Sequence, residues 1–277
     1  MSASTAIRFP AIAFIGGGNM ASAILGGLMH QGLPLSQIEV VEPWEPARAA
    51  LQQQFGVLAQ ASAGPQLERA EVVVWAIKPQ TFKEAALTTG THTGKALHLS
   101  VAAGVRSDSI AHWLGSERVV RAMPNTPALI GQGISGLYAR PTVSEAERQL
   151  VAQIMASTGE HLWVPEEAQL DAVTALSGSG PAYVFYFLEA MVQAGVEMGL
   201  GAAQAEQLAI ATFAGSSELA RRSHESPAVL RERVTSKGGT TYAALESMRA
   251  AELNRHFIAA LRAAQARAHE LGDACEA

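Results

Sequence analysis

The chain has 277 residues, a length typical of about two domains. It contains 20 basic and 25 acidic residues, a formal net charge of −5. This charge argues against a protein built to bind nucleic acid or an anionic membrane, because both require a positive surface. Apolar residues make up 48% and charged residues 16% of the chain, which excludes disorder for most of it and favours apolar surface buried between subunits.

The single cysteine, Cys275, excludes an intrachain disulfide and any zinc or iron–sulfur cluster held by several cysteines. The eight histidines show no metal-ligand spacing, so no metal site is expected. No apolar stretch is long enough to span a membrane, and Met1–Phe9 lacks the apolar core of a signal peptide. The simplest expectation is a cytoplasmic protein.

Short apolar runs alternate with helical stretches, such as Ala47–Phe55, in the first part of the chain. The runs are nearly continuous in apolar residues, as expected for parallel strands buried on both faces. This alternation predicts an α/β fold with a doubly wound (Rossmann) parallel sheet. The expected strands are Ala11–Ile15, Ile38–Glu42, Val72–Ile77, Ala96–Val101 and Val119–Met123, with Ile134–Ala139 and His161–Val164 as additional edge strands.

The second part of the chain lacks strand signals and is predicted to be all helical. Apolar residues recur at helical spacing, and N-caps, prolines and glycines mark the expected helix ends. The predicted domains are residues 1–164 and 165–277. The expected helical features are Ala182–Met198 started and capped by Ser177–Pro181, then Ala202–Arg222, a helix beginning at Pro227 behind the N-cap Ser226, and Glu252–Leu271 ended by Gly272.

A glycine-rich segment, Gly16–Ala21 (GGGNMA), directly follows the first expected strand. Its spacing matches the G-x-G-x-x-(G/A) pattern, in which Gly16 permits a tight turn, Gly18 lets the backbone approach a pyrophosphate, and Ala21 lets a helix pack closely on the strand. The helix expected over Asn19–Gln31 would point its free N–H groups at the phosphates. We therefore favour dinucleotide binding over a purely structural turn.

Glu42 ends the second expected strand and follows Ala21 by 21 residues, close to the spacing of about 20 for the acid that binds the adenosine ribose. A carboxylate here favours NAD, because the extra phosphate of NADP would lie beside it. Two like charges at ~4 Å repel by about 4 kcal/mol at an effective dielectric of ~20, before screening by salt. Arg48 is close enough in sequence to offset part of this repulsion.

Five further segments together resemble the pyrroline-5-carboxylate reductase family. The resemblance runs from about Ile12 to about Gly272, nearly the whole chain. The glycine motif alone would fit many dehydrogenases, whereas this set would not. The segments are VVVWAIKPQ (Val72–Gln80), LSVAAG (Leu99–Gly104), RAMPNTPALIGQG (Arg121–Gly133), DAVTALSGSGPAY (Asp171–Tyr183) and VTSKGGTTYAALESM (Val234–Met248).

The resemblance implies an enzyme that transfers a hydride from NADPH or NADH to the C=N bond of 1-pyrroline-5-carboxylate, giving L-proline in the last step of proline biosynthesis. The family uses NADP more often, whereas Glu42 argues for NAD. The N-terminal domain would bind the cofactor. The helical domain would bind substrate and form a homodimer, and dimers would assemble further into a homodecamer.

The resemblance also assigns roles to individual residues. Backbone N–H groups of Gly238, Gly239 and Thr240 would hold the substrate carboxylate within the loop Ser236–Thr241, and the Thr241 hydroxyl, the catalytic group, would reach the ring nitrogen. Because a protonated imine is already electrophilic, the enzyme mainly has to hold two carbons about 3–3.5 Å apart. The expected cofactor-binding residues are Ile15, Gly16, Gly17, Gly18, Asn19, Met20, Glu42, Ala76, Lys78, Pro79, Ala102, Ala103 and Asn125, the last as a positioning residue.

Two departures from the family and two alternatives bear on this interpretation. Lys237 stands where a proline is common in the family, and Glu42 stands where a hydroxylated or basic residue suits NADP.

Another imine reductase or a β-hydroxyacid-type reductase is the first alternative function. The β-hydroxyacid type needs a helical lysine after the Rossmann domain, whereas the only lysine there, Lys237, is in a loop. A non-catalytic dinucleotide sensor is the second, but it would not need Ser236–Thr241.

Overall fold

The computed structural model describes residues 9–274, so the predictions about an N-terminal leader and about Cys275 concern residues outside this range. Within it, no helix combines the length and apolar character needed to cross a membrane. The chain forms two compact units: Met1–Ser179 together with Ala264–Ala277, and Gly180–Ala263. We call them the sheet unit and the helical unit, and describe each by itself.

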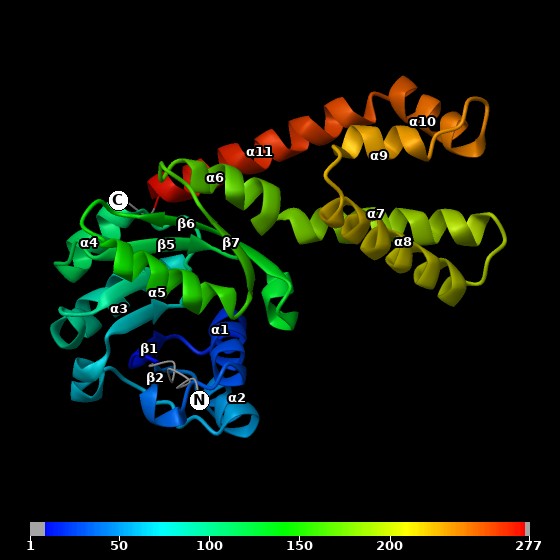
Figure 1. Ribbon diagram of the computed structural model, residues 1–277. Helices are drawn as coiled ribbons and strands as arrows, with labels where there is room; N and C mark the ends of the chain where they lie inside the picture. Colours follow the sequence, from blue (N-terminus) through cyan, green and yellow to red (C-terminus); the bar gives the residue numbers. More distant parts are fainter. Residues whose placement is uncertain (1–8, 275–277) are drawn as a thin grey trace, which may run out of the picture. The chain divides into compact units, whose positions relative to one another are not determined.

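The sheet unit is built on a seven-stranded sheet of order β2-β1-β3-β4-β5-β6-β7 (Figure 1). All neighbouring strands are parallel except β5 and β6, which are antiparallel. The predicted α/β fold and every predicted strand are confirmed. The strands are β1 (Ile12–Ile15), β2 (Ile38–Val41), β3 (Val72–Trp75), β4 (Leu97–Ser100), β5 (Val119–Met123), β6 (Gly133–Ala139) and β7 (Gly159–Trp163).

The sheet is parallel except between β5 and β6, and the prediction that Ile134–Ala139 forms an edge strand was wrong. β6 lies between β5 and β7, so of the two additional strands only β7 lies at an edge of the sheet. Between β5 and β6 the chain makes only a short 3-10 turn, η3 (Thr126–Ile130). A parallel connection needs a crossover of about a dozen residues or more, so this short link returns the chain antiparallel to β5.

Helices cover both faces of the sheet. Alternate residues of β1 enter different cores: Ile12 and Phe14 pack on the α1 and α5 face, whereas Ala13 and Ile15 pack on the α3 and α4 face. This alternation follows from the two-residue period of a strand. The helices of this unit are α1 (Asn19–His30), α2 (Glu45–Phe55), α3 (Pro79–Thr93), α4 (Ser107–Leu114), α5 (Glu145–Ala156) and α6 (Gln169–Val173), with shorter turns η1 (Leu35–Gln37) and η2 (Pro65–Arg69).

The helical unit confirms the predicted absence of strands in this part of the chain. α8 has the bounds predicted for it, and the Ser226 hydroxyl caps α9 by accepting the Val229 N–H. Phe257 packs edge-on against Tyr183 and Phe187, at ring distances of 5.9 and 5.6 Å. The helices are α7 (Gly180–Glu197), α8 (Ala202–Arg222), α9 (Pro227–Arg233), α10 (Thr240–Ala250) and α11 (Leu253–Ala274), the last ending in the sheet unit.

Gly272 does not end the last helix, contrary to the prediction. α11 runs through it to Ala274. A Cβ at Gly272 would lie 2.6 Å from Nε of Arg106, so a glycine here allows the Arg106 side chain to lie against the helix. A close approach from elsewhere in the chain, not helix termination, explains this glycine.

The segment before α7 also differs from the prediction. Thr174–Gly178 form a turn of π-helix, η4, between α6 and α7. The Ser177 hydroxyl donates to the Val173 carbonyl, 3.0 Å away, so it bonds backward in the helix instead of capping α7. The sheet unit includes this segment, and the chain enters the helical unit only after Ser179. The sequence places the domain boundary earlier, near residue 164.

Candidate functional site

The predicted cofactor-binding residues of the sheet unit gather at one edge of the sheet. Strands β1 to β5 are parallel, so their carboxyl ends lie together, and this is where doubly wound folds bind ligands. Each strand is followed at this edge by predicted residues. These residues are Ile15, Gly16, Gly17, Gly18, Asn19 and Met20 after or ending β1, Glu42 after β2, Ala76, Lys78 and Pro79 after β3, Ala102 and Ala103 after β4, and Asn125 after β5.

The glycine loop has the geometry that a pyrophosphate requires. Gly16 has φ +97°, and a Cβ on it would lie 2.4 Å from the Ala76 carbonyl oxygen. Gly18, the N-cap of α1, has nothing within 4 Å of a Cβ position, and no side chain caps the helix there. Gly18 and Asn19 are exposed. An open helix N-terminus with free N–H groups suits a phosphate group, so these residues fit a dinucleotide.

Glu42 is bound to the glycine loop. One carboxylate oxygen accepts the Gly17 N–H at 2.7 Å, and the other accepts the Trp44 N–H at 2.8 Å. Arg48 holds the turn that carries Glu42, because its Nη1 donates to the carbonyl oxygens of Glu42 at 3.0 Å and Pro43 at 2.6 Å. The carboxylate is therefore fixed beside the glycine loop, and it is not a freely solvated strand end.

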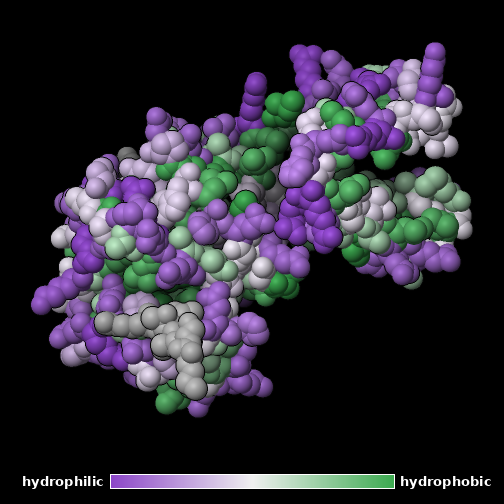
Figure 2. Space-filling view, viewed as in Figure 1, coloured by the Kyte–Doolittle hydropathy of each residue, from purple (hydrophilic) through white to green (hydrophobic). Residues whose placement is uncertain are grey.

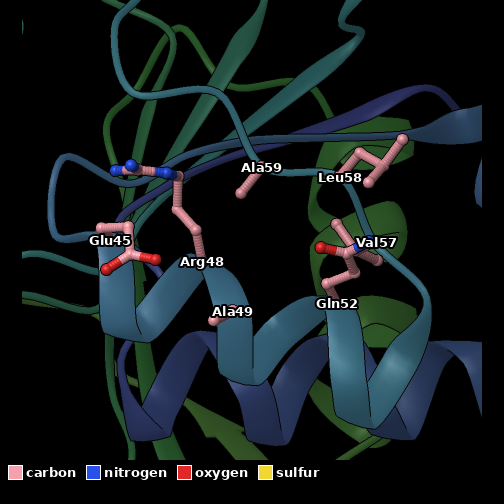
Figure 3. Close-up of a pocket in the computed structure, with 7 residues that line it drawn as sticks. All are labelled: Glu45, Arg48, Ala49, Gln52, Val57, Leu58 and Ala59. Carbon is pink, nitrogen blue, oxygen red and sulfur yellow. The ribbon is translucent and has the colours of Figure 1, made fainter.

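A small pocket of about 190 Å³ lies between α2 and the segment 57–59 (Figure 3). In Figure 3 the Arg48 side chain rises from α2, and its guanidinium lies above Glu45. The pocket is lined by one guanidinium, one carboxylate, one amide and four apolar residues. The lining residues are Glu45, Arg48, Ala49, Gln52, Val57, Leu58 and Ala59.

The ends of β3 and β4 present short, accessible segments. Lys78 is exposed and is the N-cap of α3, with Pro79 at the first helical position. After β4, Ala102 is 5% exposed, and its N–H donates to Ser100 Oγ at 3.3 Å, whereas Ala103 is exposed. Both residues of this loop carry only a methyl side chain, which is compatible with the close approach of a planar ring.

Asn125 has a positioning contact of its own. Its Oδ1 accepts the Ile134 N–H at 3.0 Å, and its carbonyl accepts the Ala128 N–H at 3.1 Å. The side chain thereby ties the end of β5 to the start of β6. This is consistent with the positioning role that was predicted for it.

A buried ion network next to the β4 loop was not predicted from the sequence. Arg106, the N-cap of α4, forms a two-bond pair with Asp171 at 3.0 and 2.9 Å, and His269 of α11 lies 3.0 Å from the same guanidinium. Glu167 accepts the Ser107 N–H at 2.6 Å and pairs with the buried Arg121. These contacts fasten residues 167–171 to the start of α4, and no local sequence pattern signals them.

The predicted substrate-binding residues lie in the helical unit, between α9 and α10. Gly238 has φ +74° and Gly239 is the N-cap of α10, which has no side-chain cap. The Gly239 N–H donates to the Ser236 carbonyl at 3.0 Å. Thr240 and Thr241 begin the helix. The loop thus ends in an uncapped helix N-terminus reached through a left-handed glycine, which is suitable for an anion such as a carboxylate.

Two family models match the chain. The model described as pyrroline-5-carboxylate reductase dimerisation matches residues 167–271. The model described as NADP oxidoreductase, coenzyme F420-dependent, matches residues 11–104. The first begins close to the predicted domain boundary, and the second covers the glycine loop, Glu42 and the ends of β3 and β4.

Curated relatives and solved structures agree with these matches. The pyrroline-5-carboxylate reductases of Pseudomonas aeruginosa and Haemophilus influenzae are 44% and 39% identical to this chain; the alignments cover 95% and 94% of it and 97% of each relative. The structure of a pyrroline-5-carboxylate reductase from Coxiella burnetii superposes with a TM-score of 0.89 at 37% identity, covering 95% of this chain and 99% of that one. The enzyme of Plasmodium falciparum, solved with NADP bound, gives 0.84 at 26% identity, covering 95% and 98%.

Proposed function

The chain belongs to the pyrroline-5-carboxylate reductase family, and from this premise we propose which of its residues perform the reaction. It is an NAD(P)H-dependent oxidoreductase that reduces the C=N bond of 1-pyrroline-5-carboxylate to give L-proline. The observation that supports the cofactor assignment best is the open N-terminus of α1 at Gly18, with Glu42 fixed beside it.

In our proposal, the sheet unit binds the dinucleotide along the carboxyl ends of its strands. The loop Ile15–Met20 holds the pyrophosphate through backbone N–H groups, and Glu42 binds the adenosine ribose. The segments after β3, β4 and β5 support the nicotinamide half, which supplies the hydride when reduced. The residues proposed for this half are Ala76, Lys78, Pro79, Ala102, Ala103 and Asn125.

The loop between α9 and α10 is our proposed substrate site. Backbone N–H groups of Gly238 and Thr240 hold the carboxylate, joined by that of Gly239 once it leaves the Ser236 carbonyl to which it donates in this structure. The Thr241 hydroxyl bonds the ring nitrogen, with Ser236 supporting the loop. Preorganised N–H groups are well suited to a carboxylate. Because the protonated imine is electrophilic by itself, binding and orientation supply most of the catalysis.

The test of this site is the steady-state loss of absorbance at 340 nm with 1-pyrroline-5-carboxylate as substrate. Thr241→Ala removes a hydrogen bond to a charged ring nitrogen, worth ~1.5–3 kcal/mol, so kcat/KM for the imine should fall by about tenfold or more. The KM for the dinucleotide should stay within about twofold of the wild type.

Thr241→Ser is the matched control, because it keeps the hydroxyl and should retain most of the activity. Equal kcat/KM in all three proteins would reject the role of Thr241. Dinucleotide binding without turnover of any cyclic imine would instead favour the sensor alternative.

We further propose that NADH is preferred over NADPH, that the helical unit forms a homodimer able to assemble into a homodecamer, and that the enzyme is cytoplasmic. The fixed carboxylate of Glu42 supports the first proposal. The dimerisation model over residues 167–271 supports the second. The third is supported by the single cysteine, since proteins of oxidising compartments commonly rely on disulfides.

A further inference from the structure

Trp44 leaves its indole ring uncovered at the edge of the dinucleotide site. The side chain is 67% exposed, although a tryptophan usually buries most of its surface. Trp75, by contrast, is fully buried, and Trp113 and Trp163 pack against the two cores. An exposed aromatic ring next to a ligand site suggests a surface on which a ligand group packs.

The backbone that carries this ring is held rigidly. The Trp44 N–H donates to Glu42 at 2.8 Å, and its carbonyl accepts the N–H groups of Ala47 and Arg48 at 3.1 and 3.2 Å. The Arg48 side chain binds the two carbonyls that precede Trp44. Because the loop is already ordered, a ligand that packs on the ring loses little of its binding energy to ordering the protein.

We propose that Trp44 is a stacking platform for the adenine ring of the cofactor. The inference rests on the proposed function, which places the pyrophosphate at Gly18 and the adenosine ribose at Glu42. In a dinucleotide the purine follows this ribose, and Trp44 follows Glu42 by two residues and is bonded to its carboxylate. Stacking of a base on an aromatic side chain raises affinity by roughly 5- to 150-fold.

The probe that tests the proposal is ADP-ribose, which carries adenine, ribose and pyrophosphate but no nicotinamide. Its binding to the full-length protein is measured by titration calorimetry, so the readout does not depend on turnover. Trp44→Ala should weaken binding by about tenfold, or about 1.4 kcal/mol, whereas Trp44→Phe, which keeps a ring, should stay within about threefold of the wild type. The quenching of tryptophan fluorescence by ADP-ribose should be lost in Trp44→Phe.

Leu58→Ala is the matched control. Leu58 is 70% exposed and lines the pocket of Figure 3, so this variant tests whether the adenine enters that pocket instead. Weakened binding in Leu58→Ala with normal binding in Trp44→Ala would overturn the stacking proposal. Unchanged affinity in Trp44→Ala would also overturn it, while leaving the proposed function intact.

Failure of the wild-type protein to bind ADP-ribose would overturn the proposed dinucleotide site, and the stacking proposal with it.

A kinetic measurement separates stacking from a structural effect. Trp44→Ala should raise the KM for NADH and for NADPH by a similar factor with kcat unchanged, because adenine is bound equally in the ground and transition states. A fall in kcat instead would point to a distorted loop and count against stacking.

Discussion

Glu42 is the residue whose position could be predicted best from the sequence. The spacing between Ala21 and the end of β2 predicted a carboxylate beside the glycine loop, and the Gly17 N–H bond at 2.7 Å confirms that placement. The parallel pairing of β1 and β2 brings the two strand ends together, so a spacing rule was sufficient. Its second contact, to the Trp44 N–H, depends on the turn that follows β2 and had no such signal.

We expect Glu42→Ser to raise the ratio of kcat/KM for NADPH to that for NADH by about tenfold or more. The substitution removes a charge that repels the extra phosphate by up to about 4 kcal/mol before screening. The measurement is steady-state kinetics with both cofactors. Glu45→Ser removes an exposed carboxylate at the start of α2 and serves as the control. Equal ratios in wild type and Glu42→Ser would show that Glu42 does not set the preference.

His98 is a buried titratable residue that the sequence did not single out. Its Nδ1 accepts the Trp75 Nε1–H at 3.2 Å, and its Nε2 lacks a hydrogen-bond partner among the described residues. Burial, with a smaller effect of the Arg118 charge, lowers the pKa of His98 from 6.5 to about 4. The folded protein therefore keeps this imidazole neutral where the unfolded chain would protonate it.

This lowered pKa predicts a loss of stability in mild acid. The contribution of His98 is complete above pH 6.5 and declines as the pH falls toward 4, because only the unfolded state gains the proton; the loss is about 2 kcal/mol at pH 5. The free energy of unfolding in urea, measured at fixed protein concentration, should therefore fall more steeply between pH 7.5 and 5 in the wild type than in His98→Gln. Parallel curves would contradict the prediction.

At the scale of elements, local patterns located the strands and helices but not their long-range contacts. The bounds of α8 follow from Gly201 before it and the arginines at its end, which are local signals. Gly272 carries the same kind of signal, yet α11 continues through it. The glycine instead leaves room for Arg106, which lies 166 positions earlier in the chain. The Arg106–Asp171 pair likewise joins residues whose proximity exists only in the folded sheet unit.

We expect Gly272→Ala to destabilise the protein, although alanine is the better helix former by about 1 kcal/mol. The added Cβ would lie 2.6 Å from the Arg106 guanidinium, which Asp171 holds in place with side-chain exposures of 11% and 8%. The pair must shift, and a displaced buried ion pair costs more than the helix gains. The melting temperature should fall by several degrees.

Gly90→Ala is the control for this substitution. Gly90 lies within α3, and a Cβ there would make only ordinary contacts with Leu114, at 3.9 Å. The same chemical change should therefore raise the melting temperature slightly. A rise in both variants would show that the approach of Arg106 does not explain Gly272.

For the whole molecule, composition predicted apolar surface between subunits. The helical unit exposes large apolar side chains, including Phe185 at 59%, Tyr186 at 71% and Leu208 at 56%, and Figure 2 shows green atoms over α7 and α8. Phe185 lies two residues from both Tyr183 and Phe187, which face Phe257, so it points to another side of α7. Composition indicated that such surface exists but could not place it.

We expect the wild-type protein to sediment at micromolar concentration as a dimer or a larger assembly. Phe185→Asp should shift it toward the monomer, because a charge buried in an apolar interface is costly. Leu87→Asp, at an equally exposed position on α3 (59%), should leave the assembly unchanged. A monomeric wild type, or equal behaviour of the two variants, would contradict this prediction.

The chain leaves the sheet unit after Ser179 and re-enters it at Ala264, so the nucleotide-binding module is discontinuous in sequence. A gene truncated after residue 179 would encode all seven strands but would lack the end of α11, which supplies His269 and Gly272 beside Arg106. An autonomous module would instead need residues 264–277 spliced back through a linker that replaces the excised helices.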